Sequence, residues 1–128
     1  MTKPLAYVVD DDRLLGEAYV HALQMCGFTA KHIQDSTKAL PLITEEQPVV
    51  VLLDMQMPML NGAQVLKALR ENESTADIKV IVATANHLML SEEVRAQANL
   101  VLQKPVSMDQ IRQFATRMLT LHKASEAD

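Results

Sequence analysis

The chain has 128 residues, of which 48% are hydrophobic and 22% charged, and its formal net charge is −4. Such a length and composition fit one globular domain and exclude a disordered or fibrous chain. An aromatic content of 3% and an acidic net charge argue against nucleic-acid binding, which usually needs stacking rings and a basic surface. The single cysteine, Cys26, excludes an internal disulfide, and no segment resembles a signal peptide or a membrane span. We therefore expect a cytoplasmic protein in which Cys26 is a small core residue.

Short apolar runs alternate with segments of helical length along the whole chain. The runs typical of buried strands are residues 5–9, 49–53, 78–83 and 100–103, with a more polar run at 29–33. Strands that alternate with helices in this way form parallel sheets through right-handed crossovers. The pattern predicts a doubly wound, three-layer α/β domain.

The first two helices are expected between the first three strands. The first covers 13–25, where apolar residues recur at helical spacing, with Asp12 as its N-cap and Gly27 as its C-terminal stop. The second covers 36–47, although Pro41 removes one backbone donor near its first turn.

Three further helices complete the pattern. Capping-box sequences begin one helix at Asn61 and the last one at Ser107. The segment between them, 91–98, has few apolar anchors and predicts a short helix. We expect one domain over residues 1–122 and a flexible, frayed tail over 123–128.

Carboxylates follow two of the apolar runs directly. Asp10, Asp11 and Asp12 come after the first run, and Asp54 comes after the run at 49–53. Because the carboxyl ends of neighbouring parallel strands meet where open α/β folds bind ligands, these acids are expected to lie together. Clustered carboxylates repel one another, and an all-oxygen set suits Mg²⁺, which completes its coordination with water and phosphate oxygens. The pattern indicates phosphoryl transfer.

Four short motifs, each at the end of an expected strand, occur together in the chain. They are Asp10-Asp11, Leu53-Asp54-Met55-Gln56-Met57-Pro58, Thr84-Ala85 and Lys104-Pro105. With these motifs the chain resembles the receiver domain of two-component response regulators, including the single-domain chemotaxis type, over nearly its whole length. The resemblance implies a flavodoxin-like fold, with a five-stranded parallel sheet in the order 2-1-3-4-5 flanked by five helices.

The resemblance also implies how the site works. Asp54 is the phosphoacceptor, whose carboxylate attacks the phosphorus of a phosphohistidine on a partner and forms an acyl phosphate. Mg²⁺ is held by Asp11, Asp54 and the backbone carbonyl of Gln56, with Asp10 acting through a bound water. Lys104 pairs with a phosphoryl oxygen as a compact positive charge.

Two more residues complete the implied site. Thr84 donates its hydroxyl to another phosphoryl oxygen. Pro105 resembles the family's cis-proline, which aims the preceding lysine. Asp12, by contrast, is expected to cap the first helix and not to bind the metal.

Several positions depart from the family pattern or remain open. The position three before the lysine is often an aromatic switch residue but here is Val101, and the glycine that often precedes the last strand is replaced by Gln97. The phosphorylation reaction should be retained, whereas the structural response that signals it must differ from the family's usual one. The alternating methionines of the loop after Asp54 are either a partner surface or partly packed: Met55, Met57 and Met59. The four histidines are interpreted as surface residues: His21, His32, His87 and His122.

The leading hypothesis is a phosphorylatable receiver that is not an enzyme in its own right. A sensor histidine kinase or a histidine phosphotransfer protein donates to Asp54, and a downstream protein binds the face formed by the fourth helix, fifth strand and fifth helix. One alternative is a receiver-like binding module that works without phosphorylation, which Val101 keeps open. The other is a haloacid-dehalogenase-like phosphatase with Asp10 as nucleophile, which leaves Asp54 without a role.

Overall fold

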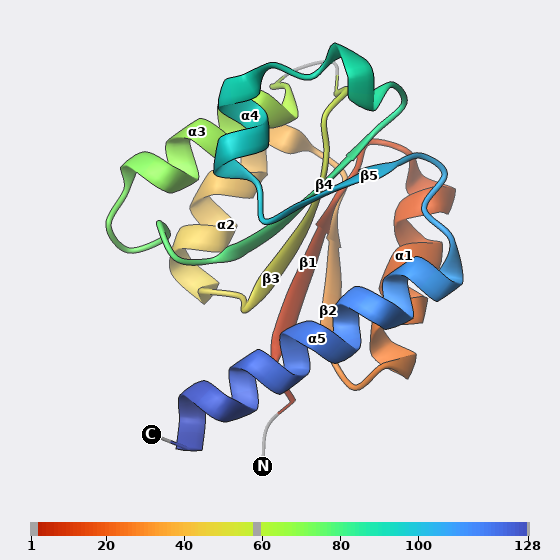
Figure 1. Cartoon of the computed structure of the whole chain (residues 1–128), viewed down its shortest axis with the longest axis vertical. Coiled ribbons are helices and arrows are strands. Elements are labelled where there is room, and N and C mark those ends of the chain that lie inside the picture. Colours follow the sequence, from red (N-terminus) through yellow and green to blue (C-terminus); the bar gives the residue numbers. More distant parts are fainter. Residues whose placement is uncertain (1–2, 58–59, 128) are drawn as a thin grey trace.

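The computed structural model describes residues 3–57 and 60–127, and within them five parallel strands form one sheet (Figure 1). The strand order is β2-β1-β3-β4-β5. The strands are β1 (Leu5–Val9), β2 (Thr29–Ile33), β3 (Val50–Asp54), β4 (Lys79–Thr84) and β5 (Leu100–Gln103). The expected fold class and strand order are confirmed.

Helices cover both faces of this sheet. One face is covered by α1 (Arg13–Met25) and α5 (Met108–Ala127), which pack against each other. The other is covered by α2 (Ala39–Glu46), α3 (Gly62–Glu71) and α4 (Glu92–Gln97). Two 3₁₀ helices, η1 (Ser36–Lys38) and η2 (His87–Met89), precede α2 and α4. In the described part of the chain, no helix is both long and apolar enough to cross a membrane.

Side chains of successive strand residues enter two separate cores. In β1, Ala6 and Val8 face the core under α1 and α5, while Tyr7 and Val9 face the core under α2 and α3. All five residues of β3 are buried, as expected for a central parallel strand covered on both faces. The central strand that carries Asp54 is therefore held firmly in place.

Two strands extend one residue beyond their apolar runs. We expected the runs at 49–53 and 78–83, whereas β3 ends at Asp54 and β4 ends at Thr84. Asp54 pairs with Ala83 in the sheet register. The hydrophobic pattern stops where polar side chains begin, but the backbone ladder continues for one more step. Both candidate residues are thus held by the sheet.

The second helix begins later than its sequence pattern predicts. Residues 36–38 form the 3₁₀ helix η1, and α2 begins at Ala39, so Pro41 lies in its first turn. Backbone N–H groups in a first turn have no partner within the helix, and the missing proton of Pro41 therefore costs no hydrogen bond.

The last two helices differ in length: α4 is shorter than an average helix and α5 is longer. As expected, α4 is short, with Ser91 as its N-cap and only Val94 buried. The expected capping box of α5 is present, since Ser107 and Gln110 exchange side-chain-to-backbone hydrogen bonds of 2.9 and 3.1 Å. The expected frayed tail is helical from 123 to 127, a stretch rich in lysine, alanine and glutamate, which favour helix.

Candidate phosphoryl-transfer site

The loop after β1 presents three consecutive acids in different environments. Asp10 is 2% exposed, its N–H donates to the Ile33 carbonyl at 3.2 Å, and its Oδ1 accepts the Asp12 N–H at 2.9 Å. Asp12 caps α1 as predicted, because its side chain accepts the Leu15 N–H at 3.0 Å. Asp11 is exposed. The loop therefore buries one carboxylate and leaves its neighbour open to solvent.

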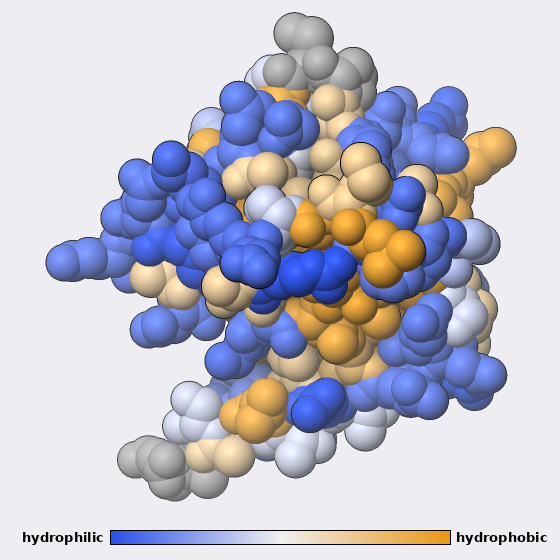
Figure 2. Space-filling model, turned by 45° about the horizontal axis from the view of Figure 1, so that its top comes forward, coloured by the Kyte–Doolittle hydropathy of each residue, from blue (hydrophilic) through white to orange (hydrophobic). Residues whose placement is uncertain are grey.

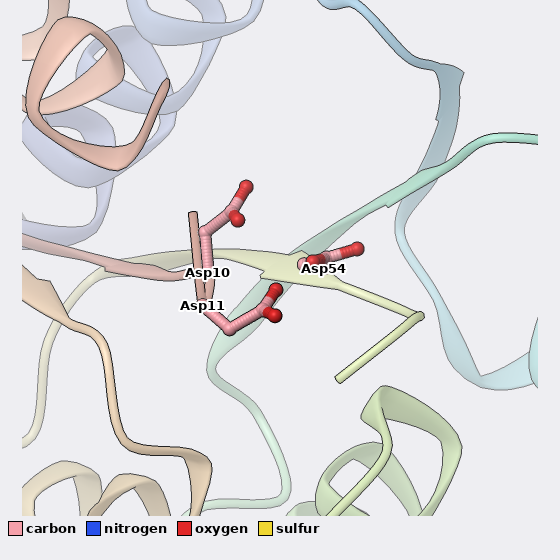
Figure 3. A group of neighbouring side chains, drawn as sticks. All are labelled: Asp10, Asp11 and Asp54. Atoms are coloured by element: carbon pink, nitrogen blue, oxygen red, sulfur yellow. The ribbon is translucent and has the colours of Figure 1, made fainter. Parts of the chain in front are cut away.

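A third carboxylate reaches this loop from the neighbouring strand. Asp54 is 2% exposed, and carboxylate oxygens of Asp10, Asp11 and Asp54 lie within 4.8 Å of one another. Figure 3 shows the three side chains at the ends of β1 and β3, extending to the same side of the sheet edge. The backbone N–H of Gln56 donates to Asp54 Oδ1 at 3.1 Å. The structure thus brings together the three acids that the sequence pattern suggested.

A lysine directly after β5 completes the cluster. Lys104 Nζ lies 3.2 Å from Asp10 Oδ2 and 3.3 Å from Asp54 Oδ2. The Lys104–Pro105 peptide bond is cis, as the sequence resemblance implied. The next residue, Val106, donates its N–H to the hydroxyl of Tyr19 at 3.1 Å, which ties this turn to α1. The ammonium group is therefore fixed between two buried carboxylates.

Burial and charge change the proton affinities within the cluster. Loss of solvation raises the pKa of Asp54 from 3.8 to about 6, and the negative charge of Asp10 adds to this, against the opposing Gln56 N–H and Lys104 ammonium. Burial opposes protonation of Lys104, but the charges of Asp10 and Asp54 outweigh it and raise the lysine pKa. At neutral pH the site therefore holds a buried, poorly solvated Asp54 carboxylate beside a fully charged lysine.

Replacing Asp54 with asparagine is expected to stabilise the metal-free protein at neutral pH by about 2 kcal/mol. The folded wild type binds the Asp54 proton more tightly than the unfolded chain does, so the stability that this proton gives the wild type is fully present below the unfolded pKa of 3.8 and is lost as the pH rises through about 6. The variant has no such loss. Urea unfolding in EDTA at several pH values measures both proteins. If the stability difference between the two proteins did not grow between about pH 4 and pH 7, the raised pKa of Asp54 would be contradicted.

The donor set fits a divalent cation. The three acids offer only carboxylate oxygens, which are the ligands preferred by hard cations such as Mg²⁺ and Ca²⁺. Three carboxylates face one ammonium, so their negative charge is not fully neutralised by the protein. Because Asp11 is exposed, the cluster is open on one side to a ligand from solution.

Thr84 lies at the end of β4 and is connected to the cluster by Gln56. Thr84 is fully buried, and its Oγ1 accepts hydrogen bonds from Gln56 Nε2 at 3.1 Å and from the Asn86 N–H at 3.3 Å. Gln56 also hydrogen-bonds Asp54 through its backbone. Every candidate residue from the sequence therefore lies at one edge of the sheet.

One residue that positions this site was interpreted wrongly from the sequence. His32 was expected at the surface, but it is half-buried on β2 and its Nε2 lies 2.7 Å from the backbone oxygen of Asp10. Its ring also packs closely on Gly16 of α1, where a Cβ would come within 2.2 Å of it. No local sequence pattern indicates this contact, which depends on the pairing of β1 with β2, in which His32 lies opposite Val8.

The structure also shows which of the remaining methionine, cysteine and histidine side chains are packed and which are exposed. Met55 and Met57 are 7% and 8% exposed, so they are packed, whereas Met59 is outside the described residues. Cys26 is half-buried against the core under α1 and α5, in agreement with its expected role. His21 and His87 are exposed, as predicted, while His122 is half-buried and lies 3.0 Å from Glu126.

Comparison with known proteins shows the family to which this chain belongs. The sequence model described as the response regulator receiver domain matches residues 6–116. The chain belongs to this family. It is therefore a receiver domain of two-component signalling, and the acids, the threonine and the lysine of the candidate site all lie within the matched segment.

Two kinds of relative support the assignment. The receiver domain is 34% identical over 124 residues to the response regulator MprA of Mycobacterium sp. (strain KMS), covering 94% of this chain and 51% of that protein. The DNA-binding dual master transcriptional regulator RpaA of Synechocystis sp. is 33% identical over 82 residues, covering 64% of this chain and 34% of that protein. The chain thus spans about half the length of MprA.

Solved structures share the fold of this receiver domain. A CheY-like receiver domain from Methylobacillus flagellatus has a TM-score of 0.83 at 21% identity, covering 91% of this chain and 99% of that one. The receiver domain of a putative LuxO repressor protein from Vibrio parahaemolyticus has a TM-score of 0.86 at 22% identity, covering 98% and 96%. These likenesses concern the fold of the domain.

Proposed function

We propose that Asp54 accepts a phosphoryl group from a phosphohistidine on a sensor histidine kinase or a histidine phosphotransfer protein, in a Mg²⁺-dependent step in the cytoplasm. The observation that carries the proposal is the geometry of Asp54 itself. It is a buried carboxylate within 4.8 Å of two further acids and 3.3 Å from a lysine ammonium. A poorly solvated carboxylate is a better nucleophile than a hydrated one, and the Lys104 ammonium can offset negative charge of an incoming phosphoryl group.

In the proposed reaction, one carboxylate oxygen of Asp54 attacks phosphorus as the bond from phosphorus to the histidine nitrogen breaks. The product is an acyl phosphate on Asp54 and a free imidazole on the partner. The Lys104 ammonium and the Thr84 hydroxyl bind phosphoryl oxygens. Hydrolysis by water later restores the carboxylate and releases inorganic phosphate. The protein thus acts as a switch that receives and loses one group.

Four residues would hold the metal in this proposal. Asp11, Asp54 and the backbone carbonyl of Gln56 are its direct ligands, and Asp10 acts through a water molecule. When bound, Mg²⁺ supplies positive charge that offsets the negative charge of the phosphoryl oxygens. The Asp10 carboxylate also accepts a hydrogen bond from Lys104 Nζ at 3.2 Å, and so orients the ammonium.

A downstream protein is proposed to bind the face formed by α4, β5 and α5. On this side of the molecule, Figure 2 shows hydrophobic surface at the centre of a mostly hydrophilic face. Half-buried Leu100 and Leu102 of the edge strand β5 contribute apolar atoms, and a cavity of about 200 Å³ lies between them and Phe114 of α5. Partial exposure of apolar side chains along an edge strand suits a protein partner.

The first test is intact mass after incubation with Mg²⁺ and acetyl phosphate. The wild type should gain one phosphoryl group only when Mg²⁺ is present, and Asp54→Asn should gain none, because an amide is not a nucleophile for this transfer. Asp109→Asn, an exposed acid of α5, serves as the matched control and should behave as the wild type. If Asp54→Asn gained a phosphoryl group, the acceptor would be a residue other than Asp54. No uptake from acetyl phosphate or from any histidine kinase tested would favour a binding module that works without phosphorylation.

A further inference from the structure

The loop that follows β4 is held by the side chain of Gln56, which comes from the loop after β3. Gln56 Nε2 donates to Thr84 Oγ1 at 3.1 Å, and its Oε1 accepts the Ala85 N–H at 3.2 Å. The backbone N–H of the same glutamine donates to Asp54 Oδ1 at 3.1 Å. One residue therefore contacts the proposed phosphoacceptor through its backbone and the β4 loop through its carboxamide.

A second glutamine holds the other side of this loop. Gln103 Nε2 donates to the Ala85 carbonyl, and its Oε1 accepts the His87 N–H at 3.1 Å and lies 2.7 Å from His87 Nδ1. Ala85 is thus bound through its N–H by one glutamine and through its carbonyl by the other. The 3₁₀ helix η2 follows and carries Leu88 and Met89, which are 78% and 79% exposed. A shift of Ala85 would reach this exposed apolar pair through Gln103 and His87.

The residue on β5 that could report the position of this loop is a valine. Val101 is half-buried and packs with the core under α2 and α3. A β-branched side chain is stiff about χ1, and valine has neither a ring nor a polar group that could follow Thr84. The state of the β4 loop must therefore be read through other side chains.

We infer that Gln56 is a latch of the unphosphorylated protein, whose carboxamide holds Thr84 and Ala85 until a phosphoryl group on Asp54 displaces it. The inference rests on the proposed role of Asp54. Ala85 lies two residues beyond Ala83, which pairs with Asp54 in the sheet, and its N–H has a single proton, which it donates to Gln56. A charged phosphoryl oxygen accepts a stronger hydrogen bond than the neutral carboxamide does, so it wins this donor. Loss of the Ala85 contact then releases the Gln56 side chain from Thr84 as well.

The latch predicts that removing the carboxamide makes the site easier to fill. Gln56→Ala should bind the phosphoryl analogue beryllofluoride, in the presence of Mg²⁺, about fivefold more tightly than the wild type, because one competing hydrogen bond is absent. In the unliganded variant, the Ala85 amide should exchange with solvent about tenfold faster, and beryllofluoride should restore its protection.

The experiment compares beryllofluoride titrations with amide exchange followed by NMR in the wild type, Gln56→Ala and Gln56→Asn. The shorter asparagine cannot span both contacts and should behave as alanine does. Gln113→Ala, which removes an exposed glutamine of α5, is the matched control and should leave both quantities unchanged. Tighter binding together with faster Ala85 exchange in both Gln56 variants supports the latch.

The outcomes separate the latch from the function on which it rests. A wild type that does not bind beryllofluoride overturns the proposed phosphoacceptor and the latch together. A wild type that binds, with Gln56 variants of equal affinity and unchanged Ala85 exchange, overturns the latch alone. Weaker binding by the variants also overturns it, because Gln56 would then support the phosphoryl group. A role limited to water access would alter only the lifetime of the acyl phosphate.

Discussion

Replacing Lys104 with methionine is expected to slow Mg²⁺-dependent phosphorylation of Asp54 by about two to three orders of magnitude. The Lys104 ammonium lies 3.3 Å from the Asp54 carboxylate, where it can neutralise charge that develops on the phosphoryl group. Methionine has a similar length and packs adaptably, but it carries no charge. The variant therefore removes the electrostatic contribution with little change in volume.

Metal binding should respond to this substitution in the opposite direction. Without the ammonium, Asp10 and Asp54 lose their counter-charge, so the acidic cluster should attract a divalent cation more strongly. Calorimetric titration with Mg²⁺ and phosphorylation rates from acetyl phosphate measure the two effects separately. Lys67→Met, at an exposed position of α3, is the control and should change neither. If Lys104→Met lost metal affinity and phosphorylation together, the lysine would be acting mainly by holding the acidic loop in shape.

The architecture could be predicted from the sequence because the apolar runs and capping residues are local signals. β1, β2, β5 and α1 have the predicted bounds, since their ends coincide with changes in hydrophobicity or with caps such as Asp12. The shift by one residue in β3 and β4 arises because backbone pairing extends to Asp54 and Thr84, beyond the apolar run. Hydrophobicity reports the burial of side chains and does not indicate where the backbone pairing of a strand ends.

The acids and the lysine of the site could also be predicted, because each follows a strand. The side-chain contacts of Gln56, His32 and Arg70 could not, since their partners lie in other strands, helices or loops. Arg70, for example, donates to the carbonyls of Ala76, Ile78 and Gln97 and to the side chain of Asn99. These bonds join α3 to the end of α4, and they help explain how a six-residue helix with one buried side chain is held in place. Such contacts depend on tertiary register, which no local pattern encodes.

Replacing Gly62 with alanine is expected to destabilise the protein by about 2–4 kcal/mol, although alanine has the higher helix propensity. Gly62 is the first residue of α3 and lies against the loop after β3. A Cβ there would come within 2.5 Å of the Asp54 carbonyl oxygen and within 2.8 Å of Met55 Cα. Both atoms belong to the backbone, which cannot move without shifting the strand end that carries the proposed phosphoacceptor.

Gly16→Ala provides the comparison for this prediction, because the three atoms nearest its new Cβ all belong to the imidazole of His32. That ring can rotate away at the expense of its contact with the Asp10 carbonyl, so the loss of stability should be smaller than for Gly62→Ala. Urea unfolding in EDTA gives the free energies, and Gly16→Ala combined with His32→Ala should recover part of the loss, because the clash is removed. If Gly62→Ala proved as stable as the wild type, the Asp54 strand end would be free to move by several tenths of an ångström. A strand end that yields in this way could not keep the Asp54 carboxylate in a fixed position relative to Lys104.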